Sequence, residues 1–152
     1  MEAVAVEKIE EVDARLRRAK ASSIPLEERL EKLPGLLYAK ELEIYELSEA
    51  LAAIKDQLET IEREEYLRID GETIRDSNGK VKKKFSNEAA RQAELQRRLR
   101  DSEKYQRLKV REKATHDRLE NLKIEHSFLA RLYSSTKYLA RLRVATAEEV
   151  EG

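Results

Sequence analysis

Residues that interrupt helices are rare in this chain of 152 residues, which has four glycines and two prolines. Apart from the C-terminal Gly152, they lie at Pro25, at Pro34–Gly35, and in the dipeptides Asp70–Gly71 and Asn78–Gly79. Because glycine and proline are the strongest local breakers of helices, the stretches between them are free to form long helices. The pattern predicts an all-α protein: a long antiparallel helical hairpin or coiled-coil bundle with a short turn or β-hairpin at its tip, assembled into an oligomer.

The breaks divide the chain into three expected segments. Residues 1–35 are expected to form an N-terminal helical segment with proline breaks, in which Ile9, Val12 and Leu16 have helical spacing. Residues 36–146 are expected to form the hairpin, with a helix over 36–69, an interruption over 70–86 and a second long helix over 87–144. The tail, 147–152, is expected to fray, as chain ends that nothing holds in place commonly do.

The interruption over 70–86 has the composition of a small β-hairpin. The tripeptides 73–75 (Thr-Ile-Arg) and 80–82 (Lys-Val-Lys) flank Asn78–Gly79, and Asn-Gly is a strong signal for a hairpin turn. A two-stranded hairpin is marginal in water, so it would lean on the helices or stay mobile. Either Ser86 or Asn87 is expected to cap the helix that follows.

Apolar residues in the helical stretches alternate in steps of three and four, which is typical of a coiled-coil seam. Such narrow stripes bury little against a globular core, so the sequence predicts self-association through them. The predicted interface residues lie in the first helix and in the C-terminal half of the second: Ile44, Leu47, Leu51, Ile54, Leu58, Ile61, Leu122, Leu129 and Leu132.

Composition argues against several classes of protein. The chain has no cysteine, which excludes disulfides and thiolate metal sites. It has no apolar run of about 18 residues and begins with an acidic segment, so we expect a cytoplasmic protein without membrane contact. Glu112, His116 and Glu120 are four apart, but the pattern does not match a metal-binding helical bundle. His126 is expected to be a polar residue in a seam. We therefore expect no enzyme activity, no small-molecule substrate, no metal and no cofactor.

The net charge of zero conceals an asymmetry along the chain. Residues 1–76 have 12 basic and 20 acidic residues, whereas residues 77–152 have 19 basic and 11 acidic residues. Between 80 and 113 the basic residues outnumber the acidic ones by 13 to five. Such a surface attracts phosphate backbones, and Phe85, Tyr66 and Tyr105 are candidates for stacking against bases. The predicted nucleic-acid contacts are Lys80, Lys82, Lys83, Lys84, Arg91, Arg97 and Arg98.

The layout of residues 36–143 resembles the UvsY-type recombination mediators of phages. Leu37-Tyr38-Ala39-Lys40 opens a long acidic helix, Tyr66-Leu67-Arg68-Ile69-Asp70-Gly71 leads into a turn, and a basic helix follows. The resemblance implies an oligomeric helical protein that binds single-stranded DNA and helps to load a recombinase onto strands covered by a single-strand-binding protein. The family's basic and aromatic segment before the turn reads here 61–66, Ile-Glu-Arg-Glu-Glu-Tyr, in which only Arg63 and Tyr66 fit that role.

Two functional hypotheses remain open from the sequence. In the first, a protein of phage origin binds single-stranded DNA through the basic run and acts with a recombinase or a single-strand-binding protein. In the second, the protein is a structural coiled-coil adaptor or assembly protein, and its basic residues only pair with the acidic helix. The position of the four lysines at the hairpin tip, beyond most of the acids, favours the first.

Overall fold

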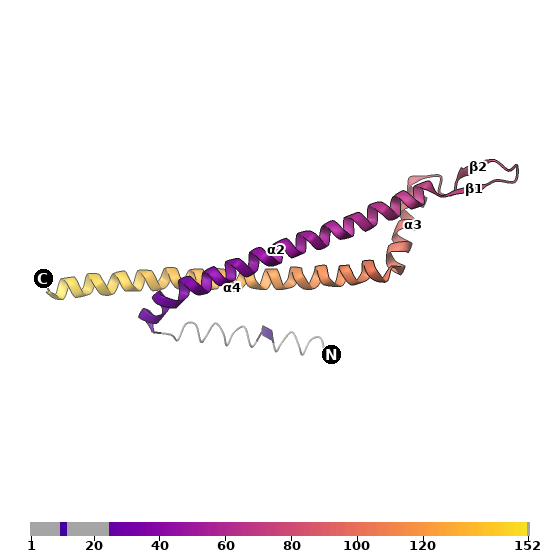
Figure 1. Cartoon of the computed structure of the whole chain (residues 1–152). Coiled ribbons are helices and arrows are strands. Elements are labelled where there is room, and N and C mark those ends of the chain that lie inside the picture. The colour runs from indigo at the N-terminus through magenta and orange to yellow at the C-terminus, as the bar shows by residue number, and fades with distance from the viewer. Residues whose placement is uncertain (1–9, 12–24, 152) are drawn as a thin grey trace. The chain divides into compact units, whose positions relative to one another are not determined.

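The structure is a computed structural model that describes residues 10–11 and 25–151 (Figure 1). Within this part of the chain, helix α2 (Leu26–Gly71) is followed by strands β1 (Thr73–Arg75) and β2 (Val81–Lys83), and then by helices α3 (Glu88–Asp101) and α4 (Glu103–Glu151). The mostly helical fold with one short hairpin is therefore confirmed. The expected helix around Ile9, Val12 and Leu16 lies outside the described residues.

Helix α2 passes through Pro34 and Gly35, where the sequence predicted a break. A proline inside a helix removes one backbone hydrogen bond and typically costs about 3 kcal/mol. The carbonyl that loses its donor belongs to Leu30, which is half-buried, while Leu33 beside the proline is buried. The helix therefore begins at Leu26 rather than at residue 36, and the expected boundary between 35 and 36 is not a helix boundary.

The predicted helix over 87–144 is two helices, because the chain turns at Ser102. The backbone N–H of Ser102 donates to the carbonyl of Leu99, and Gln106 Nε2 donates to the same carbonyl at 3.1 Å. The Ser102 hydroxyl accepts from the backbone N–H of Tyr105, as an N-cap does. Ser102 thus ends α3 and starts α4. Helix α4 then continues to Glu151, beyond the expected end at 144 and through most of the expected tail.

Contacts between residues divide the chain into two compact units, which we describe separately. The first unit contains residues 1–44 and 121–152, and the second contains residues 45–120.

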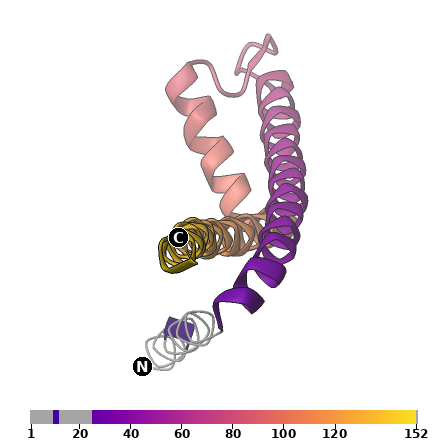
Figure 2. The ribbon, with the colours of Figure 1, turned by 90° about the vertical axis from the view of Figure 1, so that its left-hand side faces the viewer.

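The second unit has a hydrophobic core made by α2, α3 and α4. Figure 2 shows α3 running back from the strands beside the C-terminal part of α2 to the start of α4. Apolar residues of all three helices pack together there because the turn at Ser102 brings both α3 and α4 against α2. The members of this core cluster are Ile54, Leu58, Ile69, Leu95, Leu99, Tyr105 and Leu108, with Ile61, Tyr66 and Phe85 packed against it.

The first unit pairs the beginning of α2 with the C-terminal part of α4 in antiparallel directions. Arg143 pairs with Glu27 at 3.0 Å, and Lys40 pairs with Glu125 at 3.1 Å. A later residue of α2 thus pairs with an earlier residue of α4, so the two helices run in opposite directions. Leu33, Leu122 and Thr136 are buried in this unit. Thr136 satisfies its hydroxyl by donating to the carbonyl of Leu132 at 2.7 Å. The antiparallel pairing of the two long helices is thus present here as predicted.

Candidate nucleic-acid interface

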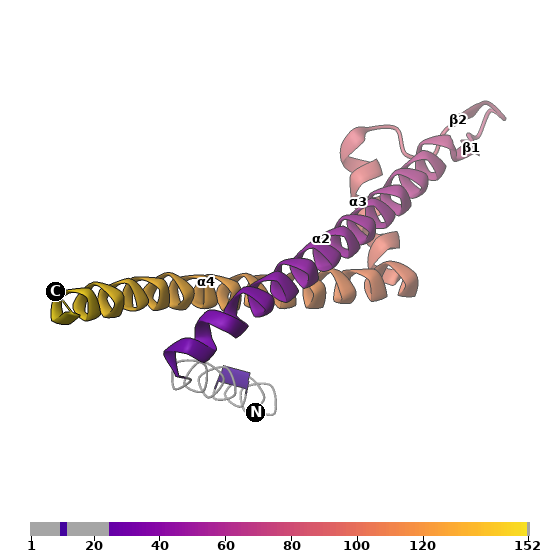
Figure 3. The same ribbon diagram turned by 60° about the vertical axis from the view of Figure 1, so that its left-hand side comes forward.

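The β-hairpin extends past the C-terminal end of α2 in the second unit (Figure 3). Thr73 pairs with Lys83, Ile74 with Lys82 and Arg75 with Val81. The strand register therefore differs from the predicted 80–82 strand by one residue. Opposite residues of an antiparallel pair share a face, so Lys82 lies beside Ile74, while Arg75 lies beside Val81.

The turn between the strands is organised by Asp76 and Gly79. The Asp76 carboxylate accepts from the backbone N–H of Asn78 and of Lys80, each at 2.9 Å, and the Asp76 carbonyl accepts from Gly79. Gly79 has φ of 74°, a conformation that glycine adopts without steric cost. The loop is therefore a three-residue turn with a glycine bulge rather than a two-residue Asn-Gly turn. It holds Lys80 at the start of β2.

Three cations of the hairpin, Arg75, Lys80 and Lys82, are exposed. Among the residues that the structure describes, no carboxylate lies within 4 Å of Arg75, Lys80 or Lys82. Two of them, Lys80 and Lys82, are predicted contacts. Arg75 was missed because the prediction followed the run of lysines. The available signal was the alternation of apolar Ile74 and basic Arg75 in a strand. These three side chains form what we call the free cation group.

Lys83 and Lys84 lie at the base of the hairpin and are already paired. Lys83 Nζ is 3.0 Å from Asp70 Oδ1, and Lys84 Nζ is 3.8 Å from Glu72 Oε2. Lys84 also lies over the ring of Phe85, 5.4 Å from its centre. Their partners, Asp70 at the end of α2 and Glu72 just before β1, lie next to the hairpin rather than farther back along the acidic helix.

The three predicted arginine contacts are also engaged inside the protein. Arg98 donates to Glu72 at 2.6 Å, to Glu94 at 2.8 Å and to Glu65 at 3.3 Å. Arg97 binds Glu94 and lies 3.6 Å from Asp101. The Arg98 contacts hold α3 against the end of α2, whereas Arg97 pairs only within α3 and keeps 57% of its side chain exposed.

Arg91 makes the same kind of contact about two turns before Arg98 in α3. It binds Glu88, donates to the Phe85 carbonyl at 3.1 Å and lies 3.9 Å from Asp70. Glu88 accepts a further hydrogen bond from the Tyr66 hydroxyl at 2.8 Å. The helix start itself is fixed by Asn87, whose side chain accepts from the backbone N–H of Ala90, so Asn87 and not Ser86 is the cap.

The arginines strongly favour the ionised form of Glu94. Hydrogen bonds from Arg97 and then from Arg98 lower the pKa of Glu94 to about 2. Hydrogen bonds to Glu94 and Glu72 in turn raise the pKa of Arg98. The cluster is therefore a charged network that is fully formed near neutral pH.

The aromatic residues proposed for base stacking are poorly placed for it. Tyr105 is buried in the core of the second unit, so its stacking role is ruled out. Tyr66 and Phe85 are half-buried against the same core. Around the free cation group the exposed apolar side chains are instead Ile74 and Val81.

Four of the nine predicted oligomer-interface residues are core within one chain. Leu51, Ile54, Leu58 and Leu122 are buried, which corrects their assignment to an intermolecular seam. The other predicted interface residues, Ile44, Leu47, Ile61, Leu129 and Leu132, are half-buried. The large apolar residues that α4 leaves exposed in the described part of the first unit are instead Ile124, Tyr138, Leu139, Leu142 and Val144.

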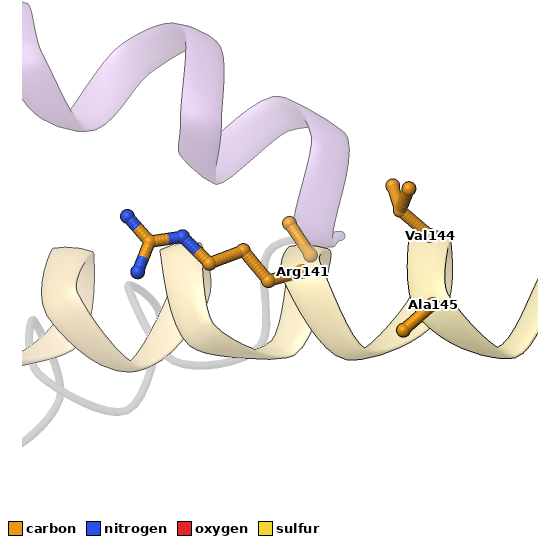
Figure 4. A pocket seen from close by; sticks show the side chains of 4 residues that line it. Arg141, Val144 and Ala145 are labelled. Carbon is orange, nitrogen blue, oxygen red and sulfur yellow. The ribbon is translucent and has the colours of Figure 1, made fainter.

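Each of the two histidines lies beside one carboxylate. His126 Nε2 lies 3.1 Å from Glu41 Oε1, and His116 Nδ1 lies 3.5 Å from its neighbour Asp117. No group of three or more potential metal ligands occurs among the described residues. A shallow pocket on α4 is lined by Ala140, Arg141, Val144 and Ala145, of which only Arg141 is polar (Figure 4).

No protein-family model, curated protein or solved structure matches this chain. Within the described residues, no helix combines the length and the apolar character that crossing a membrane requires.

Proposed function

We propose that this protein is a non-enzymatic, self-associating helical protein that binds single-stranded DNA through its β-hairpin. The observation that supports this is the free cation group of Arg75, Lys80 and Lys82. All three are exposed, and no carboxylate of the described chain neutralises them. Phosphate backbones bind such groups without sequence preference, because binding releases counterions.

The place of the free cation group suits a binding role better than a folding role. The strands have exposed side chains throughout, and the hydrophobic core of the second unit contains none of them. Charges there are not needed to hold the helices together. The further role in recombinase loading, with a phage origin, rests on the resemblance in layout to UvsY-type mediators and is part of the same proposal.

A second candidate, a structural adaptor without nucleic acid, is favoured by a different observation. Five of the seven predicted contacts, Lys83, Lys84, Arg91, Arg97 and Arg98, already pair with carboxylates. If the free cation group binds nothing, these pairs account for most of the predicted contacts as internal electrostatics.

Self-association is proposed through the first unit rather than through the buried seam. On α4, Ile124, Leu139 and Leu142 are exposed, and on α2, Tyr38 and Leu42 are exposed. Over residues 26–44, α2 has five acidic and three basic residues, whereas residues 121–144 of α4 have five basic and one acidic. The opposite charges favour α2 of one copy against α4 of a second copy.

The DNA proposal is tested by fluorescence anisotropy with a labelled single strand and a duplex of the same sequence, over a series of salt concentrations. Three contacted phosphates give a slope of log K against log salt of about −2 for a single strand. The variant Lys80→Glu/Lys82→Glu should lose most of the affinity and flatten the slope. Lys104→Glu/Lys113→Glu, with the same change of charge at exposed sites on α4, is the matched control.

The outcomes separate the candidates. Loss of binding in the hairpin variant alone supports the proposal. An equal loss in both variants means that binding follows total charge rather than the hairpin. Tighter binding of the duplex removes the single-strand preference. No binding by the unaltered protein at low salt favours the structural adaptor.

A further inference from the structure

The base of the hairpin brings two lysines against two carboxylates in a fixed arrangement. Thr73, two residues after the end of α2, pairs with Lys83 at the end of β2. The backbone N–H of Lys84 donates to the carbonyl of Glu72 at 2.9 Å. Lys83 and Lys84 are therefore held beside Asp70 and Glu72 by the main chain, whatever rotamers the side chains adopt.

The lysines differ from the nearby arginines in how tightly the protein holds them. Lys83 and Lys84 keep 57% and 50% of their side chains exposed and have one carboxylate partner each. Arg98, by contrast, is 21% exposed and bonded to three carboxylates. The lysine ammonium is a compact charge on a flexible stem. The two lysines can therefore turn to another anion, whereas Arg98 stays in place.

Glu72 is anchored independently of Lys84. Its Oε1 accepts from Arg98 at 2.6 Å, while its Oε2 faces Lys84 at 3.8 Å. When Lys84 turns away, Glu72 stays at the hairpin base, bonded to Arg98, and its Oε2 loses the neighbouring cation. Asp70 keeps only the longer contact to Arg91, at 3.9 Å, when Lys83 leaves.

We propose that Asp70 and Glu72 compete with nucleic-acid phosphate for Lys83 and Lys84, so that the hairpin base is a phosphate site occupied by the protein's own carboxylates. This inference rests on the proposed DNA binding by the free cation group. A phosphate that approaches the hairpin base must draw the lysines away from the two carboxylates. It is also repelled by the negative charge of these carboxylates. The two acids thus lower the affinity for DNA that the free cation group provides.

The test measures binding of a labelled single strand by the full-length protein and its variants. Asp70→Asn removes the competitor of Lys83 and nearly preserves the side-chain shape. It also removes a negative charge from the C-terminal end of α2, where the helix dipole disfavours one, so the fold should persist. Exposed ion pairs contribute about 0.2–1 kcal/mol, so we expect an affinity gain of roughly twofold to fivefold. Glu72→Gln should act in the same direction through Lys84.

Glu64→Gln is the matched control, because it removes one exposed negative charge from the same helix six residues earlier. The second control is Asp70→Asn in a Lys83→Gln background. If Asp70 acts through Lys83, the gain should largely disappear there. A gain of equal size in both backgrounds, or the same gain from Glu64→Gln, overturns the inference in favour of general repulsion. Circular dichroism confirms that each variant keeps its helices.

Failure of this inference is distinguishable from failure of the proposed function. If the unaltered protein binds and loses binding with Lys80→Glu/Lys82→Glu, but Asp70→Asn and Glu72→Gln change nothing, only the competition is wrong. If the unaltered protein, Asp70→Asn and Glu72→Gln all fail to bind at low salt, both proposals are wrong. Binding by the two variants but not by the unaltered protein means that the acids do block the lysines, but that the proposed DNA binding by the unaltered protein is wrong.

Discussion

The hydroxyl of Tyr105 in α4 donates a hydrogen bond to the carboxylate of Glu62 in α2, with 2.5 Å between the oxygens. Tyr105 is only 7% exposed and belongs to the core of the second unit. Burial, and then the Glu62 carboxylate, raise the pKa of Tyr105 to about 12. The neutral phenol therefore contributes stability that is fully present below about pH 10, the value for an exposed tyrosine, and is lost as pH rises towards 12.

Tyr105→Phe should destabilise the second unit by about 1–3 kcal/mol, because it leaves a carboxylate without its buried donor. Urea denaturation followed by circular dichroism at pH 7 measures this change. Tyr138→Phe on the same helix is the control, since Tyr138 is 62% exposed. Raising the pH from 10 to 12 should lower the free energy of unfolding more for the unaltered protein than for Tyr105→Phe. Equal alkaline profiles would contradict the role given to the phenol.

Acid should loosen α3 through Glu94. Its pKa falls from 4.5 in the unfolded chain to about 2 in the fold, because Arg97 and Arg98 donate to it. The stability from ionised Glu94 is therefore present above pH 4.5 and is lost as pH falls towards 2. Thermal melts from pH 5 to pH 2 should show a smaller acid-induced drop for Glu94→Gln than for the unaltered protein. Glu103→Gln, at an exposed ion pair, should keep the full drop.

The sequence predicted the elements well where one strong local signal acts alone. Asn78–Gly79 between two β-prone tripeptides predicted the hairpin, and the scarcity of glycine and proline predicted long helices. Pro34 led to a wrong helix boundary, because the stability of a helix depends on how the residues on both sides of a proline pack. Local residue preferences carry no information about that packing. Ser102 was missed because a serine cap needs neither glycine nor proline, and its neighbours Asp101 and Glu103 look helical.

The candidate site was harder to predict, because charge counting does not show which charges meet. The run of lysines is continuous in sequence, yet the strand pairing leaves Lys82 without a carboxylate partner in the described chain and sets Lys83 beside Asp70. Likewise, apolar seam residues such as Ile54 look alike whether they contact the same chain or another copy. Only the three-dimensional packing of α2, α3 and α4 distinguishes contacts within one chain from contacts between copies.

Ile69→Ala should lower the free energy of unfolding by about 2–5 kcal/mol, the range for cavities left in well-packed cores. Ile69 is 0% exposed and sits in the cluster where α2 meets α3 and α4. Leu67→Ala, two residues earlier and 61% exposed, should change it by no more than about 0.5 kcal/mol. Urea denaturation of both variants measures the difference. Similar losses for the two would mean that α3 does not pack on α2 in solution.

Leu139→Asp/Leu142→Asp should reduce the mass of the assembled protein while leaving its helical content unchanged. Both leucines are 45% exposed on α4, so an aspartate there remains solvated in a single chain. In an interface between copies the same carboxylates would be buried without partners, which is costly. Light scattering coupled to size-exclusion chromatography, at several protein concentrations, measures the mass.

Ile54→Asp provides the opposite control for the same experiment. Ile54 is buried in the core of the second unit, so its replacement should lower helicity and thermal stability in addition to any change in mass. Loss of mass without loss of helicity in the Leu139/Leu142 variant, together with loss of helicity in Ile54→Asp, assigns self-association to the exposed face of α4. If the unaltered protein is a monomer at micromolar concentration, that face does not pair two copies, and the opposite charges of α2 and α4 serve only the single chain.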